Sequence, residues 1–526
     1  METYYSSFPE GYMGIYDFTI YDMIDRNAKC FHKRNAWIEV DDGRTLTFQQ
    51  VKDNVDCLAT GLQQFGVKRG DRIGVLGKNS LEYFLLYGAA AALGAIMLPV
   101  NWRLSPEEVC FNLNDCAPKV VFVDKDFQSI IQRLKDRLTS VEKYFALGRD
   151  NDELSDFDSL MGNQGNFEQP DVSSDDGFVI IHTAAVNGSP RGALLSHNNV
   201  LLAGMNLSYF LKLTPQDVGL SVLPLFHIAG LFSTMLVFQT GALNVNISKF
   251  DASKVTKLIE ERKVSVMYEF SPMLSQILDN QEKTGAEITS LKTVIGLDTK
   301  ETIEKYQIVT GGYFCCGYGQ TETSSLCSCC LYNERPGSAG RMLPLVKTMI
   351  VNTSDRPVPV GQTGEMVIRG PLVFKGYWNC PDDNAQTFRN GWLHTGDLGR
   401  FDEDGFLWYE SRKADKELIK PGGENVYPAE VEKVILEHPD VERVVVFGVP
   451  DPKWKEGIKA VCQLKAGRVL EPQVIIDFVG ERIARFKKPQ YVEFVSDFPL
   501  SEDESPDRDK IKKIYGGPQY NINGRE

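Results

Sequence analysis

The sequence has little that is typical of a membrane protein. Its only long apolar run is FLLYGAAAALGAIMLPV, residues 84–100, which reaches the lower limit of a membrane span and is interrupted by Gly88 and Gly94. The run therefore favours a buried helix over residues 81–93, followed by a short strand over 95–100. We expect no transmembrane segment.

Positive charge is also scarce. The 526 residues include 57 Lys and Arg against 71 Asp and Glu, which gives a net charge of −14. A dedicated nucleic-acid-binding protein presents a basic face, so this composition argues against nucleic acid as a partner. Small anionic ligands stay compatible with it, because a local basic loop can sit on an acidic protein.

The opening residues, METYYSSFPEGYMGIYDFTI, lack the basic start and the apolar core of a secretory leader. Together with an odd number of cysteines, 11, this predicts a reducing, cytoplasmic location. The densest cysteine group lacks the paired Cys-x-x-Cys spacing of a zinc site, so we favour small buried side chains over metal binding there. That group consists of Cys315, Cys316, Cys327, Cys329 and Cys330.

The chain shows no repeats and no low-complexity linker, and its length allows two to four units. Short apolar runs alternate with amphipathic stretches, which predicts an α/β fold with parallel sheets. Strands are expected at 71–77, 95–100, 119–124, 178–183, 218–224, 264–270 and 292–297, and helices at 106–116 and 251–263.

The pattern changes near residue 335. Short strand-like segments between Gly and Pro turns predict a β-rich subdomain over about 335–411, which completes a large N-terminal domain over 1–411. A charged segment, a Gly-Gly turn, a helix entered at Pro428 and further strands then predict a small α+β C-terminal domain over 412–526.

The stretch HTAAVNGSPRG, residues 182–192, has the turn chemistry of a loop that holds phosphates. A strand-like run leads into Asn187-Gly188 and Ser189-Pro190, and the cation Arg191 follows. The usual hydroxyl side chains are missing. A working nucleotide loop, a modified one and a surface turn are all compatible with these residues.

Five segments together resemble one family. They are PLFHIAGL (224–231), YGQTET (318–323), GEMVIRGP (364–371), HTGDLG (394–399) and KELIKPGGENVYPAEVE (416–432). Their order and spacing resemble the adenylate-forming superfamily of acyl-CoA synthetases, luciferases and peptide-synthetase adenylation domains, over nearly the whole chain. The last segment is most similar to acyl-CoA synthetases.

This resemblance implies an AMP-binding large domain, a small domain that moves, and a reaction in two steps. A carboxylate attacks the α-phosphate of ATP, which releases pyrophosphate and leaves an acyl-adenylate. The thiol of CoA then displaces AMP after the small domain has rotated. Free CoA, ATP and a carboxylic acid are the implied partners, and a homodimer is a guess.

The resemblance also assigns nucleotide contacts. Glu322 would hold Mg²⁺ through a hard carboxylate oxygen, and Thr321 would offer its hydroxyl to the α-phosphate. Tyr318, between Gly317 and Gly319, would provide a flat face for adenine.

Further contacts are implied for the rest of the nucleotide. Asp397 would accept the ribose hydroxyls, because an ionised carboxylate is a bidentate acceptor, and Arg412 would also meet the ribose. The strand end at Gly296, Leu297 and Asp298 would cover the adenine.

The acid and CoA have their own implied residues. His227 would lie between the acyl pocket and the nucleotide. Gly422, Gly423 and Glu424 would meet CoA, and the pivot of the small domain would fall within 413–417. We expect the acyl pocket to be lined by Met273, Cys316, Tyr313, Cys315 and His227. Such a lining suits a medium-chain, cyclic or aromatic acid.

Two departures affect the first step. The family's phosphate loop usually reads Thr-Ser-Gly-Thr-Thr-Gly-x-Pro-Lys-Gly; here Thr183, Gly188, Pro190 and Gly192 remain, Asn187 is the only new polar group, and Arg191 replaces Lys. Backbone N–H groups can still cradle phosphate, and Arg191 can bind it bidentately.

The second departure is at the C-terminal end. The family places a Gly-Lys pair there that serves adenylation; in this chain Glu504-Ser505 occupies the matching place, and Lys510 follows in a different register. Either a shifted loop lets Lys510 substitute, or the cation is absent. The expected function is a full acyl-CoA synthetase. The alternatives are an enzyme that converts only a preformed acyl-adenylate, or a non-catalytic nucleotide- or CoA-binding protein.

Overall fold

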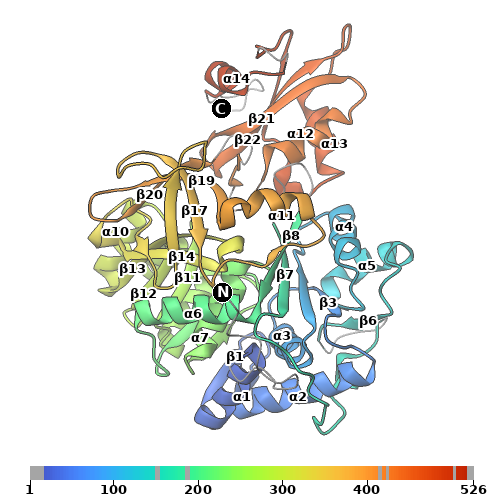
Figure 1. Cartoon of the computed structure of the whole chain (residues 1–526), viewed down its shortest axis with the longest axis vertical. Helices are drawn as coiled ribbons and strands as arrows, with labels where there is room; N and C mark the ends of the chain where they lie inside the picture. Colours follow the sequence, from blue (N-terminus) through green and yellow to red (C-terminus); the bar gives the residue numbers. More distant parts are fainter. Residues whose placement is uncertain are drawn as a thin grey trace, which may run out of the picture.

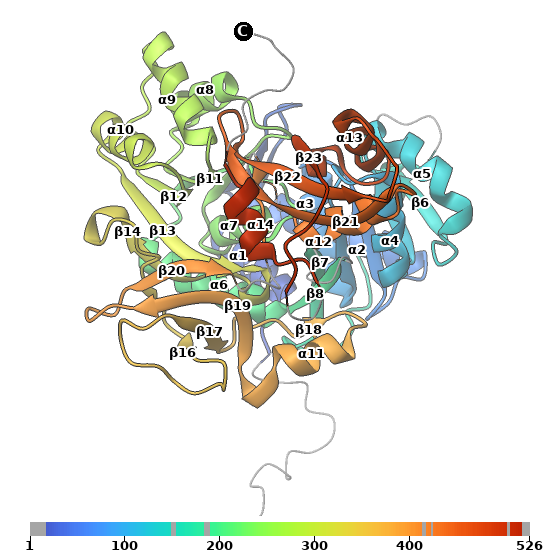
Figure 2. The same ribbon diagram turned by 90° about the horizontal axis from the view of Figure 1, so that it is seen from above.

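The structure is a computed structural model of the chain, and it describes residues 17–148, 154–183, 190–412, 417–421, 424, 426–501 and 505–517. Figures 1 and 2 show a small domain lying over the junction between two sheets of a large domain. The predicted fold class, α/β with parallel sheets in a large N-terminal domain and a small α+β C-terminal domain, is confirmed.

The first sheet has nine strands, and its six central strands from β13 to β1 run parallel. Helices α8 (Ala252–Arg262), α9 (Met273–Thr284) and α10 (Lys300–Thr310) pack on it through buried apolar residues. In spatial order the strands are β15 (Arg341–Met342), β14 (Ser325–Leu331), β13 (Tyr313–Gln320), β12 (Thr293–Leu297), β11 (Val266–Phe270), β9 (Val218–Ser221), β10 (Leu243–Asn246), β1 (Asn35–Glu39) and β2 (Thr45–Thr47).

The second sheet has seven strands in the order β18 (Gly376–Tyr377), β8 (Arg191–Ser196), β7 (Gly177–Thr183), β4 (Ile96–Val100), β3 (Arg72–Leu76), β5 (Val120–Val123) and β6 (Lys143–Ala146). One face is covered by α1 (Ile20–Phe31), α2 (Phe48–Gln64) and α3 (Leu81–Leu93), the other by α4 (Pro106–Cys116) and α5 (Gln128–Leu134). Helices α6 (His197–Leu211) and α7 (Ile228–Gln239) have residues in the cores of both sheets and so join them.

Helix α3 is the apolar segment that the sequence assigned to a buried helix. Ser80 accepts a hydrogen bond from the Tyr83 N–H at its start, and Gly94 ends it with φ 62°. Every residue of α3 is buried. Among the described residues, no helix is long and apolar enough to cross a membrane.

Two smaller sheets follow. The antiparallel sheet of β16 (Lys347–Val351), β17 (Gly364–Arg369), β19 (Leu393–Phe401) and β20 (Leu407–Arg412) contains the predicted β-rich segments, and α11 (Pro381–Thr387) lies beside it.

The small domain has the sheet β21 (Val441–Asp451), β22 (Lys455–Leu464) and β23 (Tyr491–Val495). Helices α12 (Pro428–Leu436) and α13 (Pro472–Gly480) cover one face of it, and α14 (Arg508–Tyr515) covers the other. The boundary at 411/412 stays a prediction.

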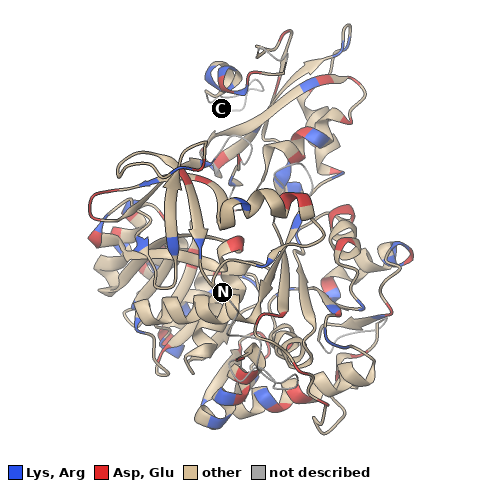
Figure 3. Cartoon of the chain, viewed as in Figure 1, with Lys and Arg blue, Asp and Glu red and all other residues tan. Residues whose placement is uncertain are grey.

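Figure 3 colours the ribbon by residue type, and among the described residues Lys and Arg positions are interspersed with Asp and Glu positions over both domains. The prediction that nucleic acid is not a partner continues to rest on composition, since a nucleic-acid-binding surface concentrates Lys and Arg on one face.

Candidate active site

The predicted nucleotide residues gather at the carboxyl ends of parallel strands. β12 ends at Leu297, β13 ends at Gln320 and β7 ends at Thr183, next to the undescribed residues 184–189. In open α/β sheets, ligands bind at this edge. Leu297 is exposed there, and Asp298 accepts a hydrogen bond from the Thr299 N–H.

One chain of contacts links four residues across this edge. The Tyr318 hydroxyl donates to Asp397 Oδ2 at 2.6 Å, and Arg412 Nε lies 3.1 Å from Asp397 Oδ1. Arg412 also donates through Nη1 to the Tyr427 hydroxyl at 3.0 Å. Asp397 is only 2% exposed, so its charge depends on these partners. Three of the four were predicted site residues, and the structure brings them together.

A second chain starts at Glu322, in the 3₁₀ turn Thr321–Thr323 after β13. Its Oε1 accepts a hydrogen bond from the Tyr377 hydroxyl at 2.6 Å, and the Arg191 guanidinium lies 4.0 Å from the centre of the Tyr377 ring. Arg191 Nη1 also pairs with Asp383 Oδ2 at 3.2 Å. The predicted cation therefore lies beside the predicted magnesium ligand, but it already has an acidic partner.

The glycines that flank Tyr318 have a packing reason. A Cβ on Gly317 would lie 2.4 Å from the Ser328 carbonyl oxygen, and one on Gly319 would lie 2.0 Å from that of Ser325, both in β14. Gly296 is in the same situation against the backbone of Glu269 in β11. Close approach of neighbouring strands thus explains these glycines, in addition to any ligand.

His227 lies at the start of α7, where its Nδ1 accepts a hydrogen bond from the Ala229 N–H at 3.1 Å. Burial, together with the nearby cations Arg103 and Lys420, lowers its pKa to about 4. The imidazole is therefore neutral at neutral pH, and its proton is on Nε2, which leaves a hydrogen-bond donor for a ligand.

The predicted pocket residues divide into two groups. Cys316 and Met273 are partly buried and pack against the core of the nine-stranded sheet. Cys315 points to the opposite face of β13, where it is fully buried, and Tyr313 is 58% exposed at the amino end of that strand. The structure therefore does not place Tyr313 and Cys315 with Cys316, because successive side chains of a strand alternate between its faces.

The proposed CoA loop contacts the large domain through Glu424, whose Oε1 lies 3.3 Å from Arg103 Nε. Arg103 in turn stacks on Trp102, at 4.4 Å from the ring centre, and lies near Phe226. Gly422 and Gly423 lie outside the described residues, as do Asn187 and Gly188 of the phosphate loop. Thr183 directly precedes that loop, and its hydroxyl donates to the Arg191 carbonyl at 3.4 Å.

Lys510 is not near this site. It lies in the first turn of α14, pairs with Asp507 at 2.9 Å, and Figure 1 shows α14 at the outer end of the small domain. Leu500 and Pro506 pair with each other, and the Asp507 N–H donates to the Pro499 carbonyl. These contacts join the described residues on either side of 502–504, which lie outside the described residues. Both alternatives, a substituting Lys510 and an absent cation, stay predictions.

The comparisons with known proteins agree with this arrangement. A family model described as "AMP-binding enzyme" matches residues 24–378, and one described as "AMP-binding enzyme C-terminal domain" matches residues 430–503. The chain is an AMP-binding enzyme. It belongs to the adenylate-forming superfamily of acyl-CoA synthetases, as the motifs predicted.

The enzyme has relatives that match it over almost their full length. The indoleacetate–CoA ligase of Aromatoleum aromaticum is 32% identical over 485 residues, 90% of this chain and 93% of that protein. A feruloyl-CoA synthase of Amycolatopsis sp. is 31% identical over 482 residues, covering 90% and 95%. A structure of a double mutant of the o-succinylbenzoate CoA synthetase of Bacillus subtilis, bound to a product analogue, has a TM-score of 0.82 at 27% identity, covering 93% and 97%.

The residues of the enzyme fit a divalent cation at Glu322. The carboxylate is 8% exposed, and the hydroxyl of Thr321 precedes it in the same turn, so hard oxygen donors are present where phosphate is expected.

A second group of close carboxylate and imidazole ligands, Asp355, Glu365 and His394, already contains a cation, because Arg389 pairs with both carboxylates.

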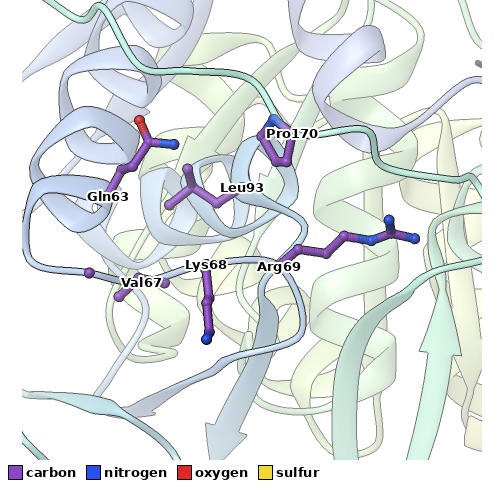
Figure 4. A pocket seen from close by; sticks show the side chains of 7 residues that line it. Gln63, Val67, Lys68, Arg69, Leu93 and Pro170 are labelled. Carbon is purple, nitrogen blue, oxygen red and sulfur yellow. The ribbon is translucent and has the colours of Figure 1, made fainter.

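A surface hollow of about 210 Å³ is unrelated to this site (Figure 4). It lies where the chain passes from α2 to β3, at the amino ends of the parallel strands. Its Gln63 amide is hydrogen-bonded to the Glu168 backbone, and Arg69 is paired with Asp176. Its lining consists of Gln63, Gly66, Val67, Lys68, Arg69, Leu93 and Pro170.

Sequence reasoning missed four residues of the site. Tyr377, Tyr427, Lys420 and Arg103 each contact a predicted residue or influence its charge. Tyr427 and Lys420 lie inside the quoted segment 416–432, so their neighbourhood carried the signal. Tyr377 and Arg103 became recognisable only through their contacts with Glu322 and Glu424.

Proposed function

We propose that the enzyme is a complete AMP-forming acyl-CoA synthetase, which converts a carboxylic acid, ATP and CoA into acyl-CoA, AMP and pyrophosphate through an acyl-adenylate. The observation that carries the proposal is the contact chain Tyr318–Asp397–Arg412–Tyr427. It connects the residues assigned to the nucleotide with the small-domain segment assigned to CoA. One chain thereby supplies groups for both half-reactions.

In the first half-reaction a carboxylate oxygen bonds to the α-phosphorus of ATP, and pyrophosphate leaves. This step needs charge neutralisation and in-line positioning more than covalent help. Thr321 and Glu322 lie together to receive phosphate and Mg²⁺, and Arg191 lies beside them. Bound Mg²⁺ would neutralise charge on the phosphates.

In the second half-reaction the CoA sulfur bonds to the acyl carbon, AMP leaves and a proton is released. His227 is neutral at physiological pH, because its pKa is lowered to about 4. Its Nδ1 accepts from the Ala229 N–H, so we assign its Nε2–H a hydrogen-bond donor role toward the acid or its adenylate. Glu424 and its partner Arg103 mark the side from which CoA would approach.

For the acid we propose an aromatic or cyclic carboxylate. Support comes from relatives named for indoleacetate and ferulate, and from Cys316 and Met273 as adaptable walls. We further propose a reducing compartment such as the cytoplasm, which agrees with eleven free cysteines, all in the described residues. A homodimer stays a proposal without further support.

A second candidate is an enzyme limited to the second half-reaction. It is favoured by one observation: the cation nearest the phosphate loop, Arg191, is engaged by Asp383 and stacked on Tyr377. If the guanidinium stays in this position, the loop lacks the cation that adenylation uses.

The test is the stoichiometry of the whole reaction. Purified enzyme is incubated with ATP, Mg²⁺, CoA and a panel of indole, phenyl, cinnamic and medium-chain acids, and products are separated by liquid chromatography with mass detection. The proposal predicts equal amounts of acyl-CoA and AMP with at least one ring-containing acid. AMP and acyl-CoA absent with every acid would contradict it.

A further inference from the structure

One short segment of the large domain carries several polar contacts with the small domain. It runs from the end of β4 into the first turn of α4. Besides the Arg103–Glu424 pair, the Ser105 hydroxyl donates to the Arg482 carbonyl at 3.3 Å, and Glu108 contacts two residues just before β23. The small domain therefore rests on residues 103–108.

Glu108 makes the most extensive of these contacts. Its Oε1 accepts a hydrogen bond from Lys487 Nζ at 2.5 Å, and its Oε2 accepts from the Ala484 N–H at 3.0 Å. The same oxygen also accepts from the Ser105 N–H at 2.8 Å, which completes the capping box of α4. Glu108 is 8% exposed, so the contact is shielded from solvent.

Lys487 lies between two carboxylates of different domains. Its Nζ also donates to Glu430 Oε1 at 2.5 Å, and both Lys487 and Glu430 are nearly buried. Burial opposes charge on Lys487, but the two carboxylates outweigh it and raise its pKa, so the ammonium persists. Glu430 and Lys487 both belong to the small domain and stay together if it moves. Glu108 does not.

The contact of Glu108 therefore exists only while the small domain has its present orientation. That orientation is also the one that places Tyr427 against Arg412 and Glu424 against Arg103. If the domain turned away, Glu108 would lose Lys487 and the Ala484 N–H, whereas Lys487 would keep Glu430. A charge-assisted, buried contact of this kind is among the stronger polar interactions in proteins.

We propose that Glu108 is a positioning residue for the second half-reaction: it holds the small domain in the orientation in which the CoA loop faces the nucleotide site. It touches neither substrate nor reacting atoms. The inference rests on the proposed function, because it assigns the present orientation to thioester formation. A ligand that binds only this orientation stabilises it further, and CoA would be such a ligand.

The test compares Glu108→Gln with Glu107→Gln. Gln keeps the α4 capping box, because its amide oxygen can still accept from the Ser105 N–H, but it removes the charge that faces Lys487. Glu107 is the adjacent acidic residue, is exposed, and pairs with Arg137 of the same domain, so it controls for a charge change at this helix start. Each variant is assayed for pyrophosphate release, and separately for acyl-CoA formation from supplied acyl-adenylate.

For Glu108→Gln we expect kcat/KM for CoA in the second half-reaction to fall about ten- to hundredfold, as loss of a charge-assisted hydrogen bond implies. Pyrophosphate release should stay within about twofold of wild type, since the contact is not part of that step. Most of the loss should appear in KM, because saturating CoA selects the same orientation. Glu107→Gln should match wild type in both assays.

Equal losses in both half-reactions, or no loss in the second, would overturn the proposal. Lys487→Gln removes the same contact from the other side of the interface. It should lower the rate of the second half-reaction relative to the first, as Glu108→Gln does. Failure of the proposed function looks different, because wild-type enzyme itself would then lack pyrophosphate release, thioester formation or both. Urea unfolding of each variant verifies that the assays are made on folded protein.

Discussion

The hydroxyl of Tyr318 donates to Asp397 Oδ2 at 2.6 Å and joins β13 of the nine-stranded sheet to β19 of the antiparallel sheet. Burial, followed by the charge of Asp397, raises the pKa of Tyr318 far above its usual value, so the phenol stays protonated and remains a donor. The residue expected to stack on adenine thus also carries a structural hydrogen bond to the residue expected to hold the ribose.

Tyr318→Phe should separate these two roles. The ring is kept and a buried hydrogen bond to a carboxylate is lost, so the free energy of unfolding should fall by about 1.5–3 kcal/mol. The KM for ATP should change by less than about threefold, since a stacking face remains. Urea unfolding and steady-state kinetics measure both; the exposed Tyr209→Phe is the control. Unchanged stability with a large rise in KM would show that the hydroxyl serves the nucleotide instead.

Arg191→Ala should suppress pyrophosphate release by about a hundredfold, which is the usual cost of removing a group that stabilises charge in the transition state. Acyl-CoA formation from supplied acyl-adenylate should be nearly unchanged. Asp383→Asn is the matched variant: it frees Arg191 from its acidic partner, and pyrophosphate release should be equal to wild type or faster. If Arg191→Ala releases pyrophosphate at the wild-type rate, the phosphate loop does not use this cation.

His227 should contribute no ionisation near neutral pH. Its pKa is lowered to about 4, so the ring is neutral above that value and gains a proton only below it. The pH profiles of wild type and His227→Asn between about pH 5.5 and 8 should therefore run parallel, with the variant slower by about tenfold for the lost hydrogen bond. An acid limb near pH 6.5 that is present in wild type and missing in the variant would contradict this assignment.

Lys510→Ala should slow pyrophosphate release by about a hundredfold and leave the conversion of supplied acyl-adenylate within about twofold. The second step should be unaffected, because Lys510 is remote from the site in the present orientation. Lys510 can act in the first step only after the small domain turns. Lys512 lies in the same helix as Lys510 and pairs with Glu417, which is outside that helix. Lys512→Ala is the control. If both variants match wild type in adenylation, the C-terminal cation has no part in it.

Much of the scaffold could be predicted because local signals agree with the fold. Helix 81–93 has a serine cap and a terminal glycine, and the strand at 95–100 follows as predicted. The family motifs also identified Tyr318, Asp397 and Arg412, which the structure brings together. The contacts among these three residues were not predicted, because the motifs indicate which residues meet the ligand and not which residues meet one another.

Other features depend on long-range packing that no short pattern encodes. Glu108 and Lys487 meet across the domain interface from distant parts of the chain. Glu108 lies in the helix predicted over 106–116, but no sequence pattern pairs it with Lys487. Tyr313 and Cys315 were grouped with Cys316 by proximity in sequence, although strand alternation and the strand's direction separate them. For Gly317 and Gly319, the neighbouring strand β14 supplies a reason that a ligand-centred interpretation overlooked.

The central claim is that one chain performs both half-reactions, and the most direct test measures them separately with the same acid. Pyrophosphate release from ATP is followed without CoA, and thioester formation is followed from the synthetic acyl-adenylate with CoA but without ATP. The account predicts that wild-type enzyme is active in both assays. Thioester formation without any pyrophosphate release would contradict it and would leave an enzyme of the second half-reaction alone.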